Sequence, residues 1–181
     1  MNIEVRRLAV YALAAAVFLV AAPTSRADSQ AGDEPFSIFL VRHAEKDQTS
    51  GSDDPGLSAC GESRAQSIAG MLADVALDRV YSTDYKRTRD TASPIASAQQ
   101  LEVSSYDPRE LDEFAGLLLE RNEDALVVGH SNTTGVLAGI LAGEGGEAFD
   151  EGLYDRLYQV VIAGGGQRRT YLLHQAFICR L

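Results

Sequence analysis

The sequence has little of several residue types, and each scarcity excludes a class of protein. It has no tryptophan and only two cysteines, too few for a disulfide-rich scaffold. Basic charge is also scarce: removing residues 1–27 would take three arginines and one glutamate from 16 basic and 26 acidic side chains, leaving a formal charge of −12. Such a surface repels nucleic acid and anionic membranes. Without internal repeats, residues 36–181 are expected to form one domain.

Only one long hydrophobic run is present, at residues 8–22. Arg6 and Arg7 precede this run, and small residues ending at Ala27 follow it. This layout predicts a secretory signal peptide over residues 1–27, cleaved after Ala27, with a polar segment over residues 28–35. An uncleaved anchor is the alternative, but fifteen residues are short for a membrane-spanning helix. We therefore expect a periplasmic or secreted protein with no membrane contact after cleavage.

The two cysteines, Cys60 and Cys179, would lie in an exported chain. An oxidising compartment permits a disulfide between them. Two small buried side chains are the other interpretation, because the sequence does not show whether the two residues meet. Both interpretations stay open at this point.

Residues 38–41, which follow Ser37, form an apolar run that stops at Arg42 and His43. Consecutive apolar residues rich in β-branched and aromatic types predict a strand buried on both faces, inside a parallel sheet. Ligands of open α/β sheets collect beyond the carboxyl ends of the strands. There Arg42 would bind an anion with its fork of donors, and His43 would act as a nucleophile, base or ligand. A strand that simply ends in polar residues explains the same pair.

A second apolar run, residues 125–128, ends at Gly129 and His130. Glycine would let the backbone approach a ligand closely. A helix beginning at residues 131–132 and reaching Leu141 would turn its first amides toward the same region. Two of the three histidines thus follow equivalent strands. The third, His174, lies in an expected strand near the end of the chain and is assigned a structural role.

Residues 82–92 supply a further basic group near a strand end. The polar residues 82–84 are expected to cap a helix that starts near Tyr85, and a helix N-terminus after a strand attracts anions. Arg87 would lie in the first turn and reach back across the strand end. Arg89 points to a different face and is expected to pair with a nearby aspartate.

Four motifs, taken together and in this order, resemble the histidine phosphatase superfamily, also called phosphoglycerate mutase-like, and in particular its small phosphatases. The resemblance covers about residues 36–171. It implies a three-layer α/β/α fold around a mainly parallel sheet, with no metal and no cofactor. It assigns catalysis to Arg42, His43, Arg87 and His130. The motifs are Arg42-His43-Ala44-Glu45, Leu57-Ser58-x-x-Gly61-x-x-Arg64-Ala65, residues 82–92 and Gly129-His130-Ser131-Asn132.

Phosphoryl transfer needs an in-line nucleophile and fixed positive charge around the nonbridging oxygens. His43 would be the nucleophile and form a phosphohistidine. The neighbouring arginines would keep its ring unprotonated, and an acceptor would have to hold its other nitrogen. The groups expected to bind the phosphate are Arg42, Arg87, His130 and Ser131.

A leaving alcohol also needs a proton, and the sequence offers three candidate acids. The segment around Glu113 resembles the place where mutase-like members of the superfamily carry their acid. The amphipathic pattern around it suits a solvated helix residue equally well. Asp84 and Glu45 are the other candidates. Without an acid, the enzyme would prefer phosphoramidates or aryl phosphates.

The sequence thus predicts an exported, metal-independent phosphomonoesterase similar to histidine acid phosphatases. Its substrate would be a phosphorylated small molecule or a phosphoprotein. The main alternative is a weak or inactive relative that binds a phosphorylated partner without turnover. A metal hydrolase using His43, Glu45 and His130 is disfavoured because Arg42 and Arg87 would repel a cation. A mutase is disfavoured because the chain has no long insertion to form a lid.

Overall fold

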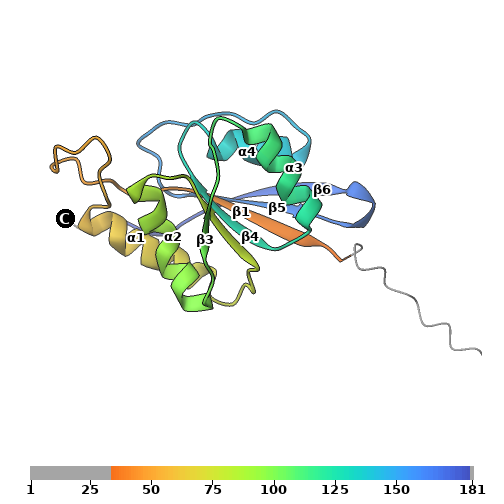
Figure 1. The fold of residues 1–181 in the computed structure, drawn as a ribbon, viewed down its shortest axis with the longest axis horizontal. Helices are drawn as coiled ribbons and strands as arrows, with labels where there is room; N and C mark the ends of the chain where they lie inside the picture. The colour runs from red at the N-terminus through yellow and green to blue at the C-terminus, as the bar shows by residue number, and fades with distance from the viewer. Residues whose placement is uncertain (1–33, 180–181) are drawn as a thin grey trace, which may run out of the picture.

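The computed structural model describes residues 34–179 (Figure 1). The expected signal peptide, residues 1–27, and most of the polar segment lie outside the described residues. No helix within residues 34–179 combines the length and apolar character needed to cross a bilayer. The strands are β1 (Phe36–Arg42), β2 (Arg79–Ser82), β3 (Val103–Ser105), β4 (Ala125–Gly129), β5 (Arg156–Ile162) and β6 (Arg168–His174). The helices are α1 (Ala59–Met71), α2 (Lys86–Gln99), α3 (Leu111–Arg121) and α4 (Thr134–Ala142), with a short 3-10 turn at Gly164–Gly166.

The six strands form one sheet in the order β3-β2-β4-β1-β5-β6. Strands β3, β2, β4 and β1 pair in parallel, whereas β5 pairs antiparallel with both β1 and β6. Helices α1 and α2 lie on one side of the sheet, and α3 and α4 lie on the other (Figure 1). The expected three-layer α/β/α fold with a mainly parallel sheet is confirmed.

Strand β1 runs through the middle of the hydrophobic core and is buried on both faces. Ile38 and Leu40 pack on the side of α3 and α4. Phe39 and Val41 pack on the side of α1 and α2. A strand that buries alternate residues in two separate layers needs apolar side chains at every position, which explains the unbroken apolar run.

The register between β1 and β4 places the two strand-end histidines side by side. Arg42 pairs with Gly129 across the parallel ladder, and the backbone N–H of His43 donates to the carbonyl of Gly129 at 2.9 Å. The residues that follow, His43 and His130, therefore leave the sheet at the same edge. The end of β2 joins them there, because the N–H of Thr83 donates to the carbonyl of Val128.

Two helix starts differ from the sequence expectation. Helix α2 has Tyr85 at its N-cap, without a side-chain hydrogen bond, and residues 82–84 do not cap it. The carboxylate of Asp54, from the loop before α1, accepts a hydrogen bond from the N–H of Lys86 instead. Helix α4 begins at Thr134, later than expected, after a turn in which Thr134 N–H donates to the carbonyl of His130. Both starts are set by tertiary contacts that local capping patterns do not contain.

Candidate active site

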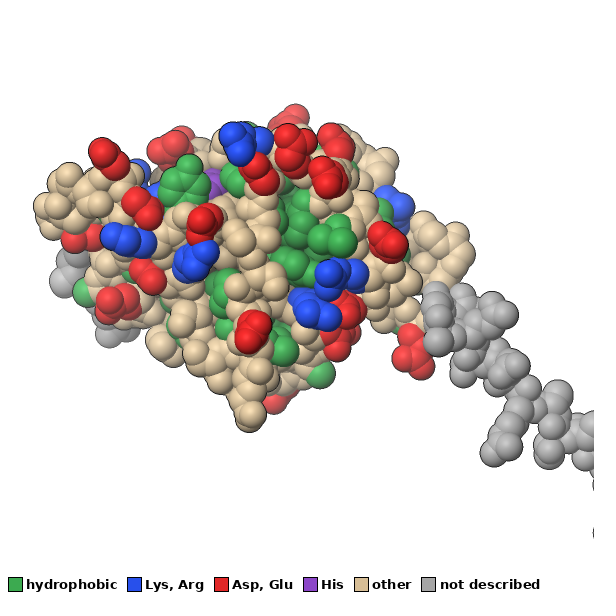
Figure 2. Space-filling model, viewed as in Figure 1, with side chains coloured by type: hydrophobic (Ala, Val, Ile, Leu, Met, Phe, Trp, Pro, Cys, Tyr) green, Lys and Arg blue, Asp and Glu red, His purple; other side chains and the backbone are tan. Residues whose placement is uncertain are grey.

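A hollow of about 420 Å³ lies at the carboxyl ends of β1 and β4. It brings together Arg42, His43, Arg87 and His130, from three separate parts of the chain, and the expected phosphate ligand Ser131 also lines it. The ring centroids of His43 and His130 are 5.4 Å apart. Figure 2 shows a histidine between hydrophobic and basic side chains, on a face where acidic side chains are widely spread. The four groups can therefore act on one bound anion. The residues lining the hollow are Arg42, His43, Lys46, Tyr85, Arg87, Pro108, Arg109, His130, Ser131, Asn132, Thr133 and Glu151.

His43 is held in one tautomer. Its Nδ1 lies 2.7 Å from the carbonyl oxygen of Ala44, an atom that can only accept, so Nδ1 carries the proton and Nε2 keeps a free lone pair. Thr91 on α2 accepts a hydrogen bond from the N–H of Ala44 and fixes this turn. Burial lowers the pKa of His43 to about 3, and the charges of Arg42 and Arg87 act in the same direction. The imidazole is therefore neutral at pH 7.

His130 is fixed by the segment between β2 and α2. Its Nε2 lies 2.9 Å from the hydroxyl of Thr83, which is itself 3.0 Å from the hydroxyl of Thr88. The Tyr85 ring approaches it edge-on, with centroids 5.1 Å apart. The pKa of His130 is lowered to about 4. Burial is the largest cause, and the charges of Arg87 and Arg42 act in the same direction. Both histidines are therefore neutral at pH 7.

Arg42 is buried at the end of β1 and is held by the loop before β5. Its Nη1 donates to the backbone carbonyls of Glu151 and Leu153. Its guanidinium lies over the Tyr154 ring, 4.1 Å from the centroid. Its Nε is buried and has no hydrogen-bond partner among the described residues. A buried guanidinium with an unused donor is suited to an anion.

Arg87 lies in the first turn of α2, as expected. Its guanidinium lies over the Tyr85 ring, and Nη1 is 3.5 Å from Asp54 Oδ1. This ion pair is long, so most donors of Arg87 stay free for an anion in the hollow. Arg89 pairs with Asp84 on the exposed side of the helix, which confirms the expectation that it points elsewhere.

The glycine before His130 serves packing. A Cβ on Gly129 would lie 2.8 Å from the Tyr106 hydroxyl and 2.9 Å from Thr133 Oγ1. This packing is a reason for glycine that the sequence did not indicate, and close approach of the backbone to a ligand stays a prediction. Gly129 makes room for side chains beneath the turn that carries His130.

The structure does not bring the expected acids to the hollow. Glu113 is exposed on α3 and lines a different hollow with Tyr81, Tyr106 and Phe114. The solvated-helix interpretation fits this position better than the catalytic one. Asp84 is exposed and paired with Arg89. Glu45 is engaged by Arg64, whose Nε and Nη2 donate to its carboxylate at 2.6–2.9 Å. None of the three faces the histidines.

The second sequence motif supports the loop that carries His43. Ser58 is the N-cap of α1, as expected, and its side chain accepts from the N–H of Gly61. The Ser58 N–H also donates to the carbonyl of Glu45 at 2.9 Å. A Cβ on Gly61 would lie only 2.2 Å from that carbonyl oxygen. With Arg64 binding the Glu45 side chain, α1 therefore holds Glu45 by both its backbone and its carboxylate.

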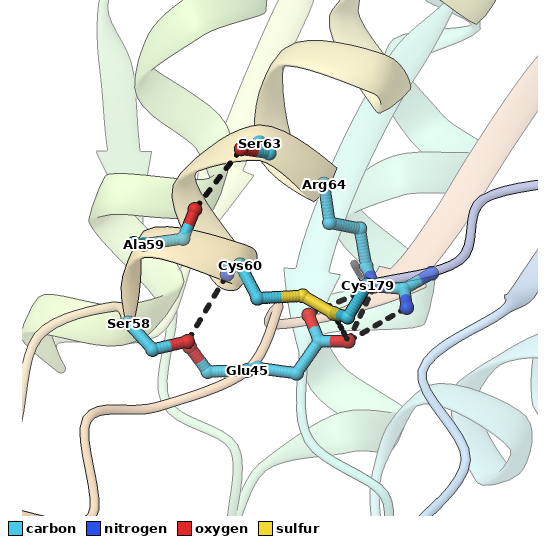
Figure 3. The surroundings of a disulfide bond; sticks show 8 residues. Glu45, Ser58, Ala59, Cys60, Ser63, Arg64 and Cys179 are labelled. Atoms are coloured by element: carbon cyan, nitrogen blue, oxygen red, sulfur yellow. Dashed lines mark hydrogen bonds and ion pairs between the residues drawn. A yellow bond between two sulfur atoms is a disulfide. The ribbon is translucent and has the colours of Figure 1, made fainter. Parts of the chain in front are cut away.

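A disulfide joins Cys60 and Cys179, with Cα atoms 5.5 Å apart (Figure 3). The bridge lies against the Glu45–Arg64 ion pair and ties the end of the chain to α1. Of the described side chains, one group of three is close enough to share a metal ion, namely Glu45, Cys60 and Cys179. The disulfide occupies both sulfurs and Arg64 occupies the carboxylate, so this group does not fit a metal.

Sequence reasoning missed Glu151, Tyr154, Lys46 and Arg109. Glu151 lies in a segment, residues 143–152, that shows no periodicity, and Tyr154 follows this segment. The segment folds over the hollow through backbone contacts, including a hydrogen bond from Phe149 N–H to the carbonyl of Ser131. Lys46 directly follows the first motif. A second basic residue near the end of the strand, in addition to Arg42, was the one signal in the sequence that could have indicated its place in the site.

The chain is similar in sequence to known proteins. Residues 38–116 match the family model of the histidine phosphatase superfamily (branch 1). Phosphoserine phosphatase 1 of Hydrogenobacter thermophilus is 40% identical over 91 residues, covering 46% of this chain and 43% of its own. "Probable phosphoglycerate mutase GpmB" of Escherichia fergusonii is 33% identical over 100 residues, covering 52% and 46%. The chain thus spans about half the length of the curated relatives it matches.

Solved structures agree in fold. The alpha-ribazole phosphatase from Shigella flexneri has a TM-score of 0.63 at 18% identity, covering 81% of this chain and all of its own. The protein histidine phosphatase SixA complexed with tungstate has a TM-score of 0.63 at 19% identity, covering 77% and 97%. These matches show that the fold is shared.

Proposed function

We propose that this chain, whose residues 38–116 match the family model of the histidine phosphatase superfamily, is a phosphatase acting through a phosphohistidine on His43. The reaction needs no metal in this proposal, since the charge comes from Arg42 and Arg87. The substrates are phosphomonoesters or phosphoramidates.

The proposal depends above all on the state of His43. The ring is buried, neutral and fixed by Ala44, with Nε2 available as a nucleophile. A structural histidine at a strand end does not need two guanidiniums beside it. A nucleophile at phosphorus does, because the phosphoryl group and its transition state are anionic.

The other groups have complementary roles. Nε2 of His43 attacks phosphorus in line with the leaving oxygen, and the P–O bond breaks as the N–P bond forms. Arg42 and Arg87, which both line the hollow, bind the nonbridging oxygens. His130 and Ser131 line the same hollow and supply further donors. Water then attacks the phosphohistidine and releases inorganic phosphate.

Export and substrate class are part of the proposal. The layout of residues 1–27 supports cleavage after Ala27 and a periplasmic or secreted location. The names of similar proteins include a phosphoserine phosphatase, an alpha-ribazole phosphatase and a protein histidine phosphatase. These support a phosphorylated small molecule or a phosphoprotein as the substrate.

The test is hydrolysis of p-nitrophenyl phosphate by the purified chain, with His43→Ala and His174→Ala compared. His174 is exposed on β6 and outside the hollow, so its variant should keep full activity. His43→Ala should lose at least about 1,000-fold in kcat, as expected for removal of a covalent nucleophile. Equal activity in all three proteins would reject the enzyme. Phosphate binding without turnover would then favour a phosphate-recognition module.

A further inference from the structure

The hollow around His43 opens into a second and larger one. The second hollow, of about 840 Å³, lies between residues 46–55 and residues 151–154. The two hollows share four lining residues, Arg42, Lys46, Arg87 and Glu151. These four mark the boundary between a space lined by both histidines and a space lined by the two loops.

A phosphomonoester has two parts that fit this division. In the proposed function, on which this inference rests, the phosphoryl group lies against His43 in the smaller hollow. The alcohol part then extends into the larger hollow, whose lining is mainly polar loop residues. The ester oxygen that joins the two parts lies at the boundary. A group that protonates this oxygen must therefore be one of the boundary residues.

We propose that Glu151 is the proton donor to the leaving oxygen. Among the described residues that line the hollow around His43, it is the only one with a carboxyl group. Arg42 and Arg87 do not give up protons at ordinary pH. Lys46 is the other boundary residue with a proton to give, and the test below separates it from Glu151.

The proton balance of the two steps is complete with Glu151 alone. In the first step the electron pair of the breaking P–O bond goes to the leaving oxygen, which takes the proton of the Glu151 carboxyl. The alcohol leaves, and Glu151 is a carboxylate. In the second step this carboxylate takes a proton from water as the water oxygen attacks phosphorus. The electron pair of the N–P bond returns to Nε2 of His43, and Glu151 is again protonated.

The structure also separates the side chain of Glu151 from its backbone role. Arg42 binds the backbone carbonyl oxygen of Glu151, which every substitution at this position retains. Glu151→Gln therefore removes the acid while keeping the side-chain size and the anchor of Arg42. Glu147→Gln is a matched control, because Glu147 is exposed on the same segment and lines neither hollow.

The experiment compares kcat/KM for p-nitrophenyl phosphate and glycerol 2-phosphate. Glu151→Gln should lower kcat/KM for the alkyl phosphate by about 100-fold or more, which is the usual contribution of general acid catalysis. It should lower kcat/KM for the activated aryl phosphate far less. Glu147→Gln should change neither. Lys46→Gln should change kcat/KM for the two substrates by the same factor.

Equal losses on both substrates with Glu151→Gln would overturn the assignment, as would selective loss with Lys46→Gln. The assignment would also be overturned if the unsubstituted protein hydrolysed only activated esters, because such a protein would have no working acid. Each of these results leaves the proposed function intact. The phosphatase itself would be rejected by a different result, equal activity of His43→Ala and the unsubstituted chain.

Discussion

The Nδ1 atom of His43 and the carbonyl oxygen of Ala44 lie 2.7 Å apart, a hydrogen bond between neighbouring residues. Because the carbonyl has no proton to give, Nδ1 must donate. The bond therefore decides which nitrogen of the ring meets phosphorus. Thr91 and the carbonyl of Gly129 fix the backbone on either side of this bond, so the ring cannot exchange its two nitrogens without breaking other contacts.

We predict that the phosphorylated intermediate carries its phosphoryl group on Nε2 of His43. A rapidly quenched reaction under alkaline conditions should yield the Nε2 isomer of phosphohistidine, identified by ³¹P NMR or isomer-specific antibodies. The label should be absent in His43→Ala. The Nδ1 isomer would show that the hydrogen bond to Ala44 breaks during turnover.

The lowered pKa of His43 also predicts a pH dependence of stability. Burial lowers this pKa to about 3 in the folded chain, whereas an unfolded histidine has a pKa of 6.5. Between these values the unfolded chain binds a proton that the folded chain does not. The free energy of unfolding should therefore fall as the pH decreases below 6.5, by up to about 1.4 kcal/mol per pH unit from this group.

The measurement is urea unfolding of the normal chain and of His43→Asn between pH 8 and pH 5. The variant should show a shallower decline below pH 6.5, and the two slopes should agree above pH 7.5. Identical slopes over the whole range would mean that His43 is not protected from protonation by the fold. The slope is the readout because the substitution also changes packing.

The sequence contained the parts of the site that belong to buried strands. Residues 38–41 of β1 and residues 125–128 of β4 are all apolar, and His43 and His130 come just after the two strands, so their parallel pairing and shared edge could be predicted. Arg87 could be placed because a helix must begin soon after β2. These predictions rest on periodicity and on the geometry of parallel sheets, which local sequence encodes.

The remaining parts depend on contacts between distant segments. Glu151 lies over the hollow because Arg42, 109 residues earlier, binds its carbonyl. Glu113 was a candidate acid by position in the chain, but the amphipathic pattern around it correctly described a helix that packs with Phe114 inward. Cys60 and Cys179 are 119 residues apart, and nothing local predicts their meeting. No periodic pattern records such pairings.

Two glycines of α1 offer a matched test of the support beneath His43. A Cβ on Gly61 would lie 2.2 Å from the carbonyl oxygen of Glu45, whereas a Cβ on Gly70 would meet no atom within 4 Å. Gly61→Ala should destabilise the chain by about 1–3 kcal/mol, the usual cost of overpacking, and should lower kcat because the loop carrying His43 must move.

Gly70→Ala should leave stability unchanged or slightly raised, since alanine has the higher helix propensity. Thermal unfolding and p-nitrophenyl phosphate hydrolysis of both variants provide the comparison. Equal behaviour of the two variants would show that α1 does not pack against the loop as closely as the structure indicates.

The disulfide between Cys60 and Cys179 should contribute to stability mainly by restricting the unfolded chain. It closes a loop of 119 residues in sequence separation, and such cross-links typically contribute about 2–4 kcal/mol. Replacing both cysteines by serine should lower the free energy of unfolding by this amount. The Glu45–Arg64 ion pair stays in place, so kcat at 25 °C should change little.

Reduction with dithiothreitol provides the control for this prediction. It should lower the melting temperature of the normal chain to that of the double serine variant, and it should not affect the variant. If the reductant leaves the normal chain unchanged although free thiols appear, the cross-link does not stabilise the fold. If the normal chain also loses activity while still folded, the bridge acts on the loop carrying His43 as well. The ion pair would then be insufficient to hold Glu45, and the Cys60–Cys179 bridge would be part of the support for the nucleophile.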